Sequence, residues 1–175
     1  ARLAHGGIRL KWPEGARPNL SMILGGVGAR LEDLVGAYAA LSRGGVAGRV
    51  RYTPGDPRVE RRVMSEGAAW IVRDILERTP RPGSPTDLFD TGGRSRLAWK
   101  TGTSYGYRDS WALGTTPAYT IGVWVGRPDG TPMPGQYGAL TALPLLLEIG
   151  GSLPRGRDAG IPRRPASVAP VDICW

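Results

Sequence analysis

Three short segments between residues 96 and 126 have the pattern of β-strands and follow one another with little chain between them. They are residues 96–104, 110–115 and 119–126. In the last one, "YTIGVWVG", apolar residues alternate with small or polar ones, and its β-branched residues suit a pleated sheet. Connections this short cannot hold a crossover helix, so the strands are expected to pair antiparallel. The sequence therefore predicts an antiparallel sheet at the centre of the fold.

Helical patterns flank these strands. Residues 30–43 end at two glycines and carry an apolar stripe made of Leu31, Leu34, Val35, Tyr38 and Leu41. Residues 66–78 follow Ser65, a suitable N-cap, and their predicted apolar face consists of Ala69, Val72, Ile75 and Leu76. Residues 139–149 form a closing helix, in which Pro144 marks a kink or a late start. The chain is therefore assigned to the α+β class, with an antiparallel sheet packed against helices.

The other segments are rich in turn-forming residues. Residues 51–63 and 80–95 are predicted to be loops outside the core. Residues 152–170 combine Pro, Gly and Arg without an apolar period, which indicates a linker or tail. The sequence "VDICW" at 171–175 looks like the beginning of a further unit.

The formal net charge of +8 raises the question of a nucleic-acid partner. The arginines are scattered and form no basic run interleaved with aromatic residues, as a stacking groove for nucleic acid would require. A dispersed arginine excess with almost no lysine indicates a compositional bias of the genome, so we predict no nucleic-acid partner. A positive surface would also suit a protein that works beside an anionic membrane or cell-wall polymer. Nucleic-acid binding stays as an alternative, and it would show a steep salt dependence.

The inventory of reactive side chains excludes several kinds of site. His5 is the only histidine and Cys174 the only cysteine, so a zinc cluster and a Ser-His-Asp triad both lack residues. No metal or other cofactor is predicted. Cys174 is interpreted as an idle thiol, and no disulfide can form within the chain. No apolar run reaches the 18 residues that a membrane-spanning helix needs.

Lys100 is one of only two lysines among 23 basic residues, and it lies in the segment "AWKTGTSYGY". On a strand, Lys100 and Gly102 share one face, and Thr101 and Thr103 share the other. An ammonium group beside a bare glycine backbone, with two hydroxyls and the free N–H groups of an edge strand, can bind the carboxylate and carbonyl of an extended peptide. The alternative is an ordinary solvated lysine, because a four-residue match arises often by chance.

The wider context resembles a known family. The segments "LGG" at 24–26, "LEDLVGAYAALSRGG" at 31–45, "AWKTGTSYGYRDSWALG" at 98–114 and "YTIGVWVGRPDGTP" at 119–132 are similar, in words and in order, to the transpeptidase domain of class A penicillin-binding proteins. The "YGYRD" continuation resembles the 1C type in particular. "VDICW" resembles the junction of that type to a small C-terminal domain.

The resemblance implies a part of a β-lactamase/transpeptidase-like fold: residues 1–150 as the C-terminal part of the transpeptidase domain and 151–175 as a Pro/Arg-rich linker. It implies a bifunctional peptidoglycan synthase, a glycosyltransferase and DD-transpeptidase, on the periplasmic face of the bacterial inner membrane. A serine would attack the D-Ala-D-Ala end of a stem peptide and pass the acyl group to a neighbouring amine. The implied partners are stem peptides, β-lactams and the N-terminal remainder of the same protein, which would carry the membrane anchor.

The resemblance also assigns roles to individual residues. Lys100 would attract the terminal carboxylate and help to hold the proton network of the nucleophile. The hydroxyls of Thr101 and Thr103 would bind that carboxylate, and the Thr103 backbone N–H would be an oxyanion-hole donor. Gly102 would leave room for the substrate backbone, and Ser104 completes the predicted substrate-binding set.

Two motifs of the family are missing from the chain. A nucleophile motif S-x-x-K would need Ser at position 8 or 97, which hold Ile8 and Leu97, and S-x-N would need Ser two positions before Asn19, where Arg17 stands. In the family both motifs precede "LGG", so we expect the chain to be a fragment that lacks the nucleophile, is inactive alone and exposes apolar surface.

Two other functions remain as hypotheses. A β-lactamase or DD-carboxypeptidase would share the Lys-Thr-Gly strand, although the 31–45 helix and the 1C-type junction speak against it. A non-catalytic sensor or degenerate module could keep the carboxylate site without the serine. The sequence upstream of residue 1 would separate these hypotheses.

Overall fold

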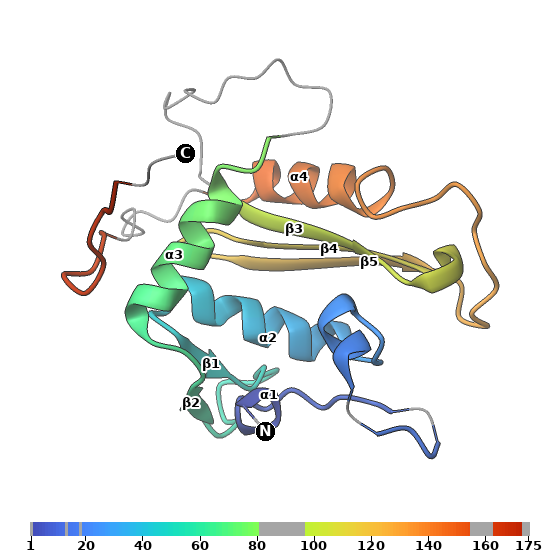
Figure 1. Ribbon diagram of the computed structural model, residues 1–175, viewed down its shortest axis with the longest axis horizontal. Coiled ribbons are helices and arrows are strands. Elements are labelled where there is room, and N and C mark those ends of the chain that lie inside the picture. Colours follow the sequence, from blue (N-terminus) through green and yellow to red (C-terminus); the bar gives the residue numbers. More distant parts are fainter. Residues whose placement is uncertain (1, 13, 18, 81–96, 155–162, 173–175) are drawn as a thin grey trace.

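The computed structural model describes residues 2–12, 14–17, 19–80, 97–154 and 163–172 (Figure 1). A three-stranded antiparallel sheet occupies its centre, built from β3 (Ala98–Thr103), β4 (Asp109–Thr115) and β5 (Thr120–Gly126). The strand order is β3-β4-β5, so β4 is the central strand. The predicted α+β class and all three predicted strands are confirmed, with ends that differ by one or two residues.

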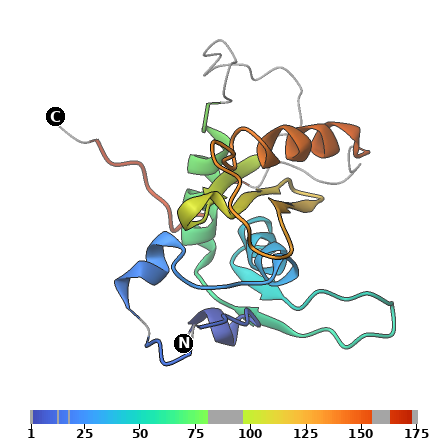
Figure 2. The same ribbon diagram turned by 90° about the vertical axis from the view of Figure 1, so that its right-hand side faces the viewer.

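Helices cover both faces of this sheet. α4 (Ala142–Ser152) packs on one face and α2 (Leu31–Ser42) on the other, as Figures 1 and 2 show. α3 (Glu66–Glu77) contacts both β3 and α2. Pro144 is the third residue of α4, where a missing backbone N–H costs nothing, so Pro144 marks a late start rather than a kink.

The main hydrophobic core lies between the sheet and α4. It consists of Leu97, Trp99, Ala112, Ile121, Val123, Ala142, Leu143 and Leu146. Gly114 lets α4 approach closely, because a Cβ at this position would lie 2.9 Å from Leu97 Cδ1 and 3.1 Å from Leu146 Cδ2. The alternation predicted for residues 119–126 is confirmed, since Ile121 and Val123 are buried on this face.

The opposite face of the sheet carries α2 through a second close approach. A Cβ on Gly122 would lie 2.5 Å from Val35 Cγ2 and 2.8 Å from Leu31 Cδ1, so the predicted apolar stripe of α2 sits directly on this glycine. At the other end of α2, Ser42 Oγ lies 2.9 Å from the Thr116 carbonyl oxygen and donates a hydrogen bond to it. The helix is therefore fixed at both ends.

The predicted apolar face of α3 is wrong in part. Ser65 caps the helix as expected, accepting a hydrogen bond from the Ala68 N–H at 3.2 Å. Ala69 is fully buried, but Val72 is 41% and Ile75 60% exposed. The inward side of α3 consists of Gly67, Ala69 and Arg73. Gly67 and Ala69 let neighbouring segments approach closely, and Arg73, which is also buried, forms an ion pair with Glu77. Periodicity alone cannot reveal this arrangement.

Residues 51–63 are not only a loop, which corrects a second prediction. Their last part forms β2 (Glu60–Arg62), which pairs antiparallel with β1 (Val46–Gly48). The strand escapes sequence inspection because Glu-Arg-Arg has no apolar alternation. The remaining elements are α1 (Arg2–His5), a short 3-10 helix η1 (Leu20–Leu24) and a 3-10 turn η2 (Tyr105–Tyr107).

Two predicted segments lie mostly or partly outside the described residues. These are the loop at 80–95, of which only Pro80 is described, and the linker predicted at 152–170, of which residues 155–162 are not described. Cys174 also lies outside the described residues. In the described part of the linker, Val168 packs against Gly67 of α3, where a Cβ would lie 3.0 Å from Val168 Cγ2. No helix within the described ranges is long and apolar enough to cross a bilayer.

We predict that Gly122→Ala destabilises the fold. The added methyl group overlaps Val35 and Leu31, and overpacking of this kind costs about 1–3 kcal/mol of unfolding free energy. The matched control is Gly151→Ala, at an α4 position with no atom within 4 Å of the new Cβ. This control should be neutral or slightly stabilising. Urea denaturation compares the two variants, and equal stability would contradict the close approach of α2.

Candidate functional site

The Lys-Thr-Gly-Thr segment occupies β3, at the edge of the sheet. β3 pairs with β4 from Ala98 opposite Thr115 to Thr103 opposite Ser110. Within the described residues, no strand pairs with its other edge. The predicted edge strand is therefore confirmed.

The backbone of β3 directs the N–H groups of Thr101 and Thr103 to this open edge. Ser104 donates its N–H to the Asp109 carbonyl oxygen on β4, at 2.9 Å. Peptide groups alternate in direction along an extended chain, so the N–H groups of Thr103 and Thr101 point away from β4. Among the described residues these two donors have no backbone partner, and they lie where the sequence analysis places the oxyanion and substrate contacts.

Lys100 and Gly102 share the face of the sheet that carries α2. Their register partners are Leu113 and Trp111 on β4. The Lys100 side chain is exposed, and its Nζ donates to the Thr101 carbonyl oxygen at 2.8 Å. The ammonium group is therefore held beside the strand, with two further N–H donors left for another acceptor.

Gly102 has open space on its side-chain side. A Cβ built there would meet only Trp111 Cβ, at 3.7 Å, which is an ordinary van der Waals contact. Internal packing therefore does not require a glycine at this position.

Thr103 is anchored by the segment that leads into α4. Its Oγ1 accepts a hydrogen bond from the Gly138 N–H at 3.1 Å. A Cβ on Gly138 would lie 2.5 Å from the Gly102 carbonyl oxygen and 2.6 Å from the Trp111 carbonyl oxygen. The Gly138 backbone therefore rests directly on the β3–β4 ladder, and this contact fixes the end of β3. The sequence analysis missed Gly138, because nothing local marks a contact that spans 35 residues.

Ser104 is already engaged within the β3–β4 hairpin. Its hydroxyl donates to Asp109 Oδ2 at 2.7 Å and accepts the Asp109 N–H at 2.9 Å. The other carboxylate oxygen of Asp109 accepts the Trp124 indole N–H at 2.9 Å. The structure therefore gives Ser104 a positioning role, and its predicted contact with substrate remains a prediction.

The β3–β4 connection is a tight turn with left-handed backbone. Gly106 has a φ of 72° and Tyr107 a φ of 57°. A positive φ is uncommon for a residue with a side chain and carries strain. The Met133 N–H donates to the Tyr107 carbonyl oxygen at 2.9 Å, so the segment between β5 and α4 supports the turn.

Comparison with curated proteins assigns the chain to a family. The chain is 51% identical, over its whole length, to penicillin-binding protein 1C of Escherichia coli K12. The chain belongs to the penicillin-binding proteins. Over 71% of its length the chain is 30% identical to penicillin-binding protein 1B of Vibrio cholerae. Over 65% of its length it is 28% identical to penicillin-binding protein 1A of Clostridium botulinum. The predicted resemblance to the 1C type is confirmed.

The chain spans 22% of the length of the E. coli relative, 18% of the V. cholerae one and 13% of the C. botulinum one. No protein-family model matches it. Among solved structures, penicillin-binding protein A of M. tuberculosis, an imipenem acyl-enzyme complex, matches 70% of this chain and 31% of its own. The TM-score is 0.46 at 19% identity, so the family assignment rests on the sequence relatives.

A concave region lies on the far side of α2 from the sheet. A cavity of about 890 Å³ lies there, and its lining includes the polar side chains of His5, Arg9, Asp33, Arg49 and Arg61. No residue of β3 lines it. Within the described residues, no group of three His, Cys, Asp or Glu side chains is placed to hold a metal ion. The cavity is therefore separate from the Lys-Thr-Gly strand.

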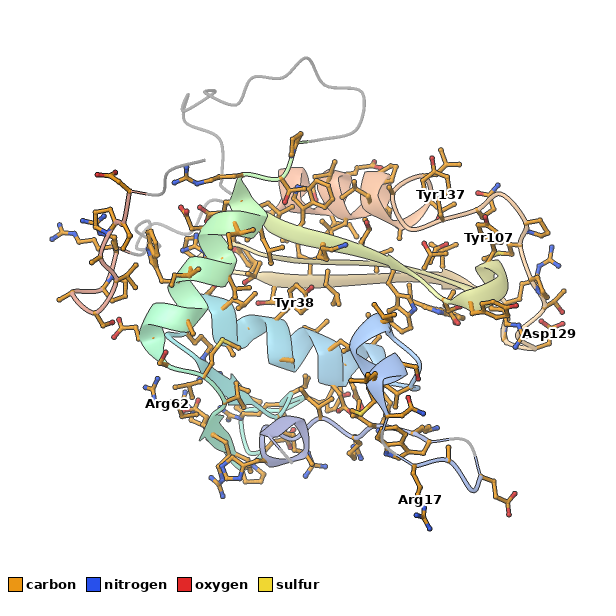
Figure 3. The ribbon with its side chains drawn as sticks, in the orientation of Figure 1. Arg17, Tyr38, Arg62, Tyr107, Asp129 and Tyr137 are labelled. Carbon is orange, nitrogen blue, oxygen red and sulfur yellow. The ribbon has the colours of Figure 1, made fainter. Side chains whose placement is uncertain are left out.

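Two titratable groups near the sheet have shifted pKa values. Burial raises the pKa of Tyr38 on α2. In the turn after β5, hydrogen bonds from the Thr131 N–H and hydroxyl lower the pKa of Asp129. Because the folded pKa of Asp129 is depressed, its stabilising effect is present at neutral pH and is lost as the pH falls through that folded value. Figure 3 labels both residues.

We predict that Gly138→Ala loosens the end of β3. The methyl group would displace the segment from the Gly102 and Trp111 carbonyls and break the bond to Thr103, at a cost of about 1–3 kcal/mol. Amide hydrogen exchange should become faster for Gly102 and Ser104, whose N–H groups face β4. Gly102→Ala is the control, because its new Cβ fits. Unchanged exchange in the Gly138 variant would contradict the anchoring contact.

Proposed function

We propose that this chain supplies the carboxylate-binding strand of a DD-transpeptidase that cross-links peptidoglycan stem peptides. The observation that carries the proposal is the outward Thr103 N–H on an unpaired edge strand, next to Lys100, in a chain that belongs to the penicillin-binding proteins. The nucleophilic serine is assigned to another part of the full-length protein.

A stem peptide would bind by adding a strand to the open edge of β3. The outward N–H groups of Thr101 and Thr103 meet the peptide backbone, which supplies affinity without side-chain specificity. Lys100 and the threonine hydroxyls would hold the terminal carboxylate. Thr103 Oγ1 already accepts one hydrogen bond from Gly138, which leaves its hydroxyl proton free to donate.

The chemistry is acyl transfer in two steps. The serine attacks the carbonyl of the penultimate D-alanine, and the Thr103 N–H stabilises the oxyanion that forms. One donor of this kind contributes about 3–4 kcal/mol in other acyl-transfer enzymes. The terminal D-alanine leaves with the proton that the serine gives up. The amine of a neighbouring stem peptide then attacks the acyl-serine ester, the serine oxygen leaves with the proton that the amine gives up, and the new amide bond is the cross-link.

β-Lactams would enter the same site. Their carboxylate takes the place of the D-alanine carboxylate near Lys100, and the opened lactam remains attached to the serine. A hydrolase of the same family would instead release the acyl group to water, so the fate of the acyl-enzyme separates a transpeptidase from a DD-carboxypeptidase or β-lactamase.

The proposal also includes the cellular location of the reaction and the other units of the parent protein. The parent protein would act at the periplasmic face of the bacterial inner membrane and would join the transpeptidase to a glycosyltransferase unit and a membrane anchor. The named relatives are bacterial penicillin-binding proteins several times longer than this chain, which leaves room for such units.

We expect Lys100→Ala, in the full-length protein, to lower the rate of fluorescent-penicillin labelling by about ten- to a hundredfold. This factor corresponds to the free energy of one charge-assisted hydrogen bond. Lys11→Ala is the matched control, since Lys11 is the other lysine, is also exposed, and lies at an isolated bridge to Gly28. Labelling of the Lys100 variant at the rate of the control would contradict the assigned role.

Gly102→Ala gives a second, independent test. The new Cβ fits the fold, so the melting temperature should stay unchanged while labelling falls, because the methyl group obstructs the incoming backbone. A variant with normal melting and normal labelling would show that the substrate does not pass over Gly102.

A further inference from the structure

We propose that the cavity on the far side of α2 is a non-catalytic binding site for peptidoglycan stem peptides, in which Arg49 and Arg61 hold free carboxylates of the peptide. We call it the basic cavity, after the three arginines of its lining, Arg9, Arg49 and Arg61. The inference rests on the proposed function for the identity of the ligand. It goes beyond that function because no residue of β3 lines the cavity.

The basic cavity lies between the N-terminal segment and the hairpin that β1 and β2 form. Residues 4–10 supply part of its lining, and Arg49 and Arg61 of the hairpin supply another part. Figure 1 shows α1, β1 and β2 together on the side of α2 that faces away from β3–β5. Two backbone hydrogen bonds between Lys11 and Gly28, at 2.7 and 2.9 Å, hold the N-terminal segment in place.

Arg49 and Arg61 belong to the same face of the hairpin. Arg61 is the register partner of Ala47, and Arg49 lies two residues after Ala47. The Arg49 N–H donates to the Val59 carbonyl oxygen at 3.0 Å, so the pairing continues beyond the strand ends. Residues two apart on a strand share a face, and diagonal neighbours on a sheet lie about 7–8 Å apart. Two guanidinium groups at this spacing suit two carboxylates of one ligand.

Neither of these arginines forms an ion pair with an acidic side chain among the described residues. Arg61 Nη1 donates to the Glu60 carbonyl oxygen at 2.8 Å, which leaves its other donors for a ligand. Like charges on one face of a sheet repel each other, so folding gives no reason for placing both there. The planar donor group of arginine fits a carboxylate, and the pair is therefore suited to bind an anion.

The one carboxylate in the described lining does not neutralise this pair. It belongs to Asp33, whose Oδ2 accepts the Arg9 N–H at 3.1 Å and lies 3.5 Å from Arg9 Nε. Arg9 and Asp33 therefore balance each other. Three arginines against one aspartate leave the lining with a net charge of +2, when His5 is counted as neutral.

The size of the basic cavity and its apolar wall indicate an organic ligand rather than a small ion. Its volume of about 890 Å³ falls within the range of organic-ligand pockets, about 300–1,000 Å³. Ile8, Leu10 and Trp12 alternate along the N-terminal segment, and all three line the cavity. An apolar wall beside a few convergent charges is typical of ligand sites.

A stem peptide has the matching chemistry. Its D-glutamate is linked through the side-chain carboxyl and keeps a free α-carboxylate, its C-terminus supplies another, and its alanines are small and apolar. A protein that cross-links such peptides works where they are abundant. A stem peptide of the existing wall, held in the basic cavity, would keep neighbouring peptides of the same strand close to β3 and so raise their effective concentration there.

The test uses the full-length protein after acylation by penicillin, which blocks the site at β3. The probe is the tripeptide L-Ala-γ-D-Glu-meso-diaminopimelate, which lacks the D-alanine pair. Titration calorimetry should show binding to the wild-type protein. Arg49→Ala and Arg61→Ala should each weaken it at least about tenfold, the factor that corresponds to one charge-assisted hydrogen bond. Penicillin labelling should stay unchanged in both variants.

Two controls localise the effect. Arg58→Ala should bind the tripeptide like the wild type, because Arg58 is an exposed arginine of the same hairpin that does not line the basic cavity. The tripeptide with its carboxylates amidated should bind the wild type at least about tenfold more weakly than the acid form. This second control needs no variant, so it decides the question even where a substitution weakens the fold.

Three results would overturn the inference. They are an equal loss in the Arg58 variant, equal binding of the amidated tripeptide, and a wild-type protein that does not bind the tripeptide because another segment of the protein or an acidic partner fills the cavity. Penicillin labelling reports on the proposed function separately. A labelled protein that does not bind the tripeptide leaves the proposed function intact, whereas a protein that penicillin fails to label overturns the proposed function whatever the binding result.

Discussion

The candidate site depends on one close contact between backbones, where Gly138 rests on the Gly102–Trp111 pair of the β3–β4 ladder. Any side chain at Gly138 would collide with the two carbonyl oxygens, at 2.5 and 2.6 Å. In this contact the Gly138 N–H donates a hydrogen bond to Thr103 Oγ1, which fixes the last residue of β3. β3 is an edge strand, and among the described residues it pairs only with β4. Edge strands otherwise fray, and a frayed end could not aim a backbone N–H at a developing oxyanion.

The rest of the fold covers both faces of the sheet but leaves the outer edge of β3 open among the described residues. Because Gly114 and Gly122 have no side chain, α4 packs closely on one face of the sheet and α2 on the other. The open edge of β3 remains the place where a chain can add. Proteins commonly protect such edges with charged residues, and Lys100 lies on this one. In the proposed function the same charge that discourages aggregation also selects a ligand with a carboxylate.

The sequence predicted what local pattern controls. The alternation in residues 119–126, the helix stops at glycine and proline and the Ser65 cap all depend on neighbouring residues, and the structure confirms them. Features that depend on distant contacts could not be predicted in this way. Val72 and Ile75 are exposed because α3 buries Gly67, Ala69 and Arg73 instead. Glu60–Arg62 forms a strand only because β1 lies beside it. Within the site, Lys100 stood out because the chain has only two lysines, and the roles of Thr101, Gly102 and Thr103 were implied by the family resemblance. Gly138 and Asp109 act through contacts that only the folded chain reveals.

The central claim is that the Thr103 N–H is an unpaired donor that a bound acyl group occupies. Amide hydrogen exchange in the full-length protein, measured before and after acylation by a β-lactam, tests it directly. The account predicts that the Thr103 amide exchanges readily in the free protein and becomes strongly protected in the acylated one, while the Gly28 amide, bonded to Lys11 away from β3, does not change. A Thr103 amide already protected in the free protein, or unaffected by acylation, would contradict it.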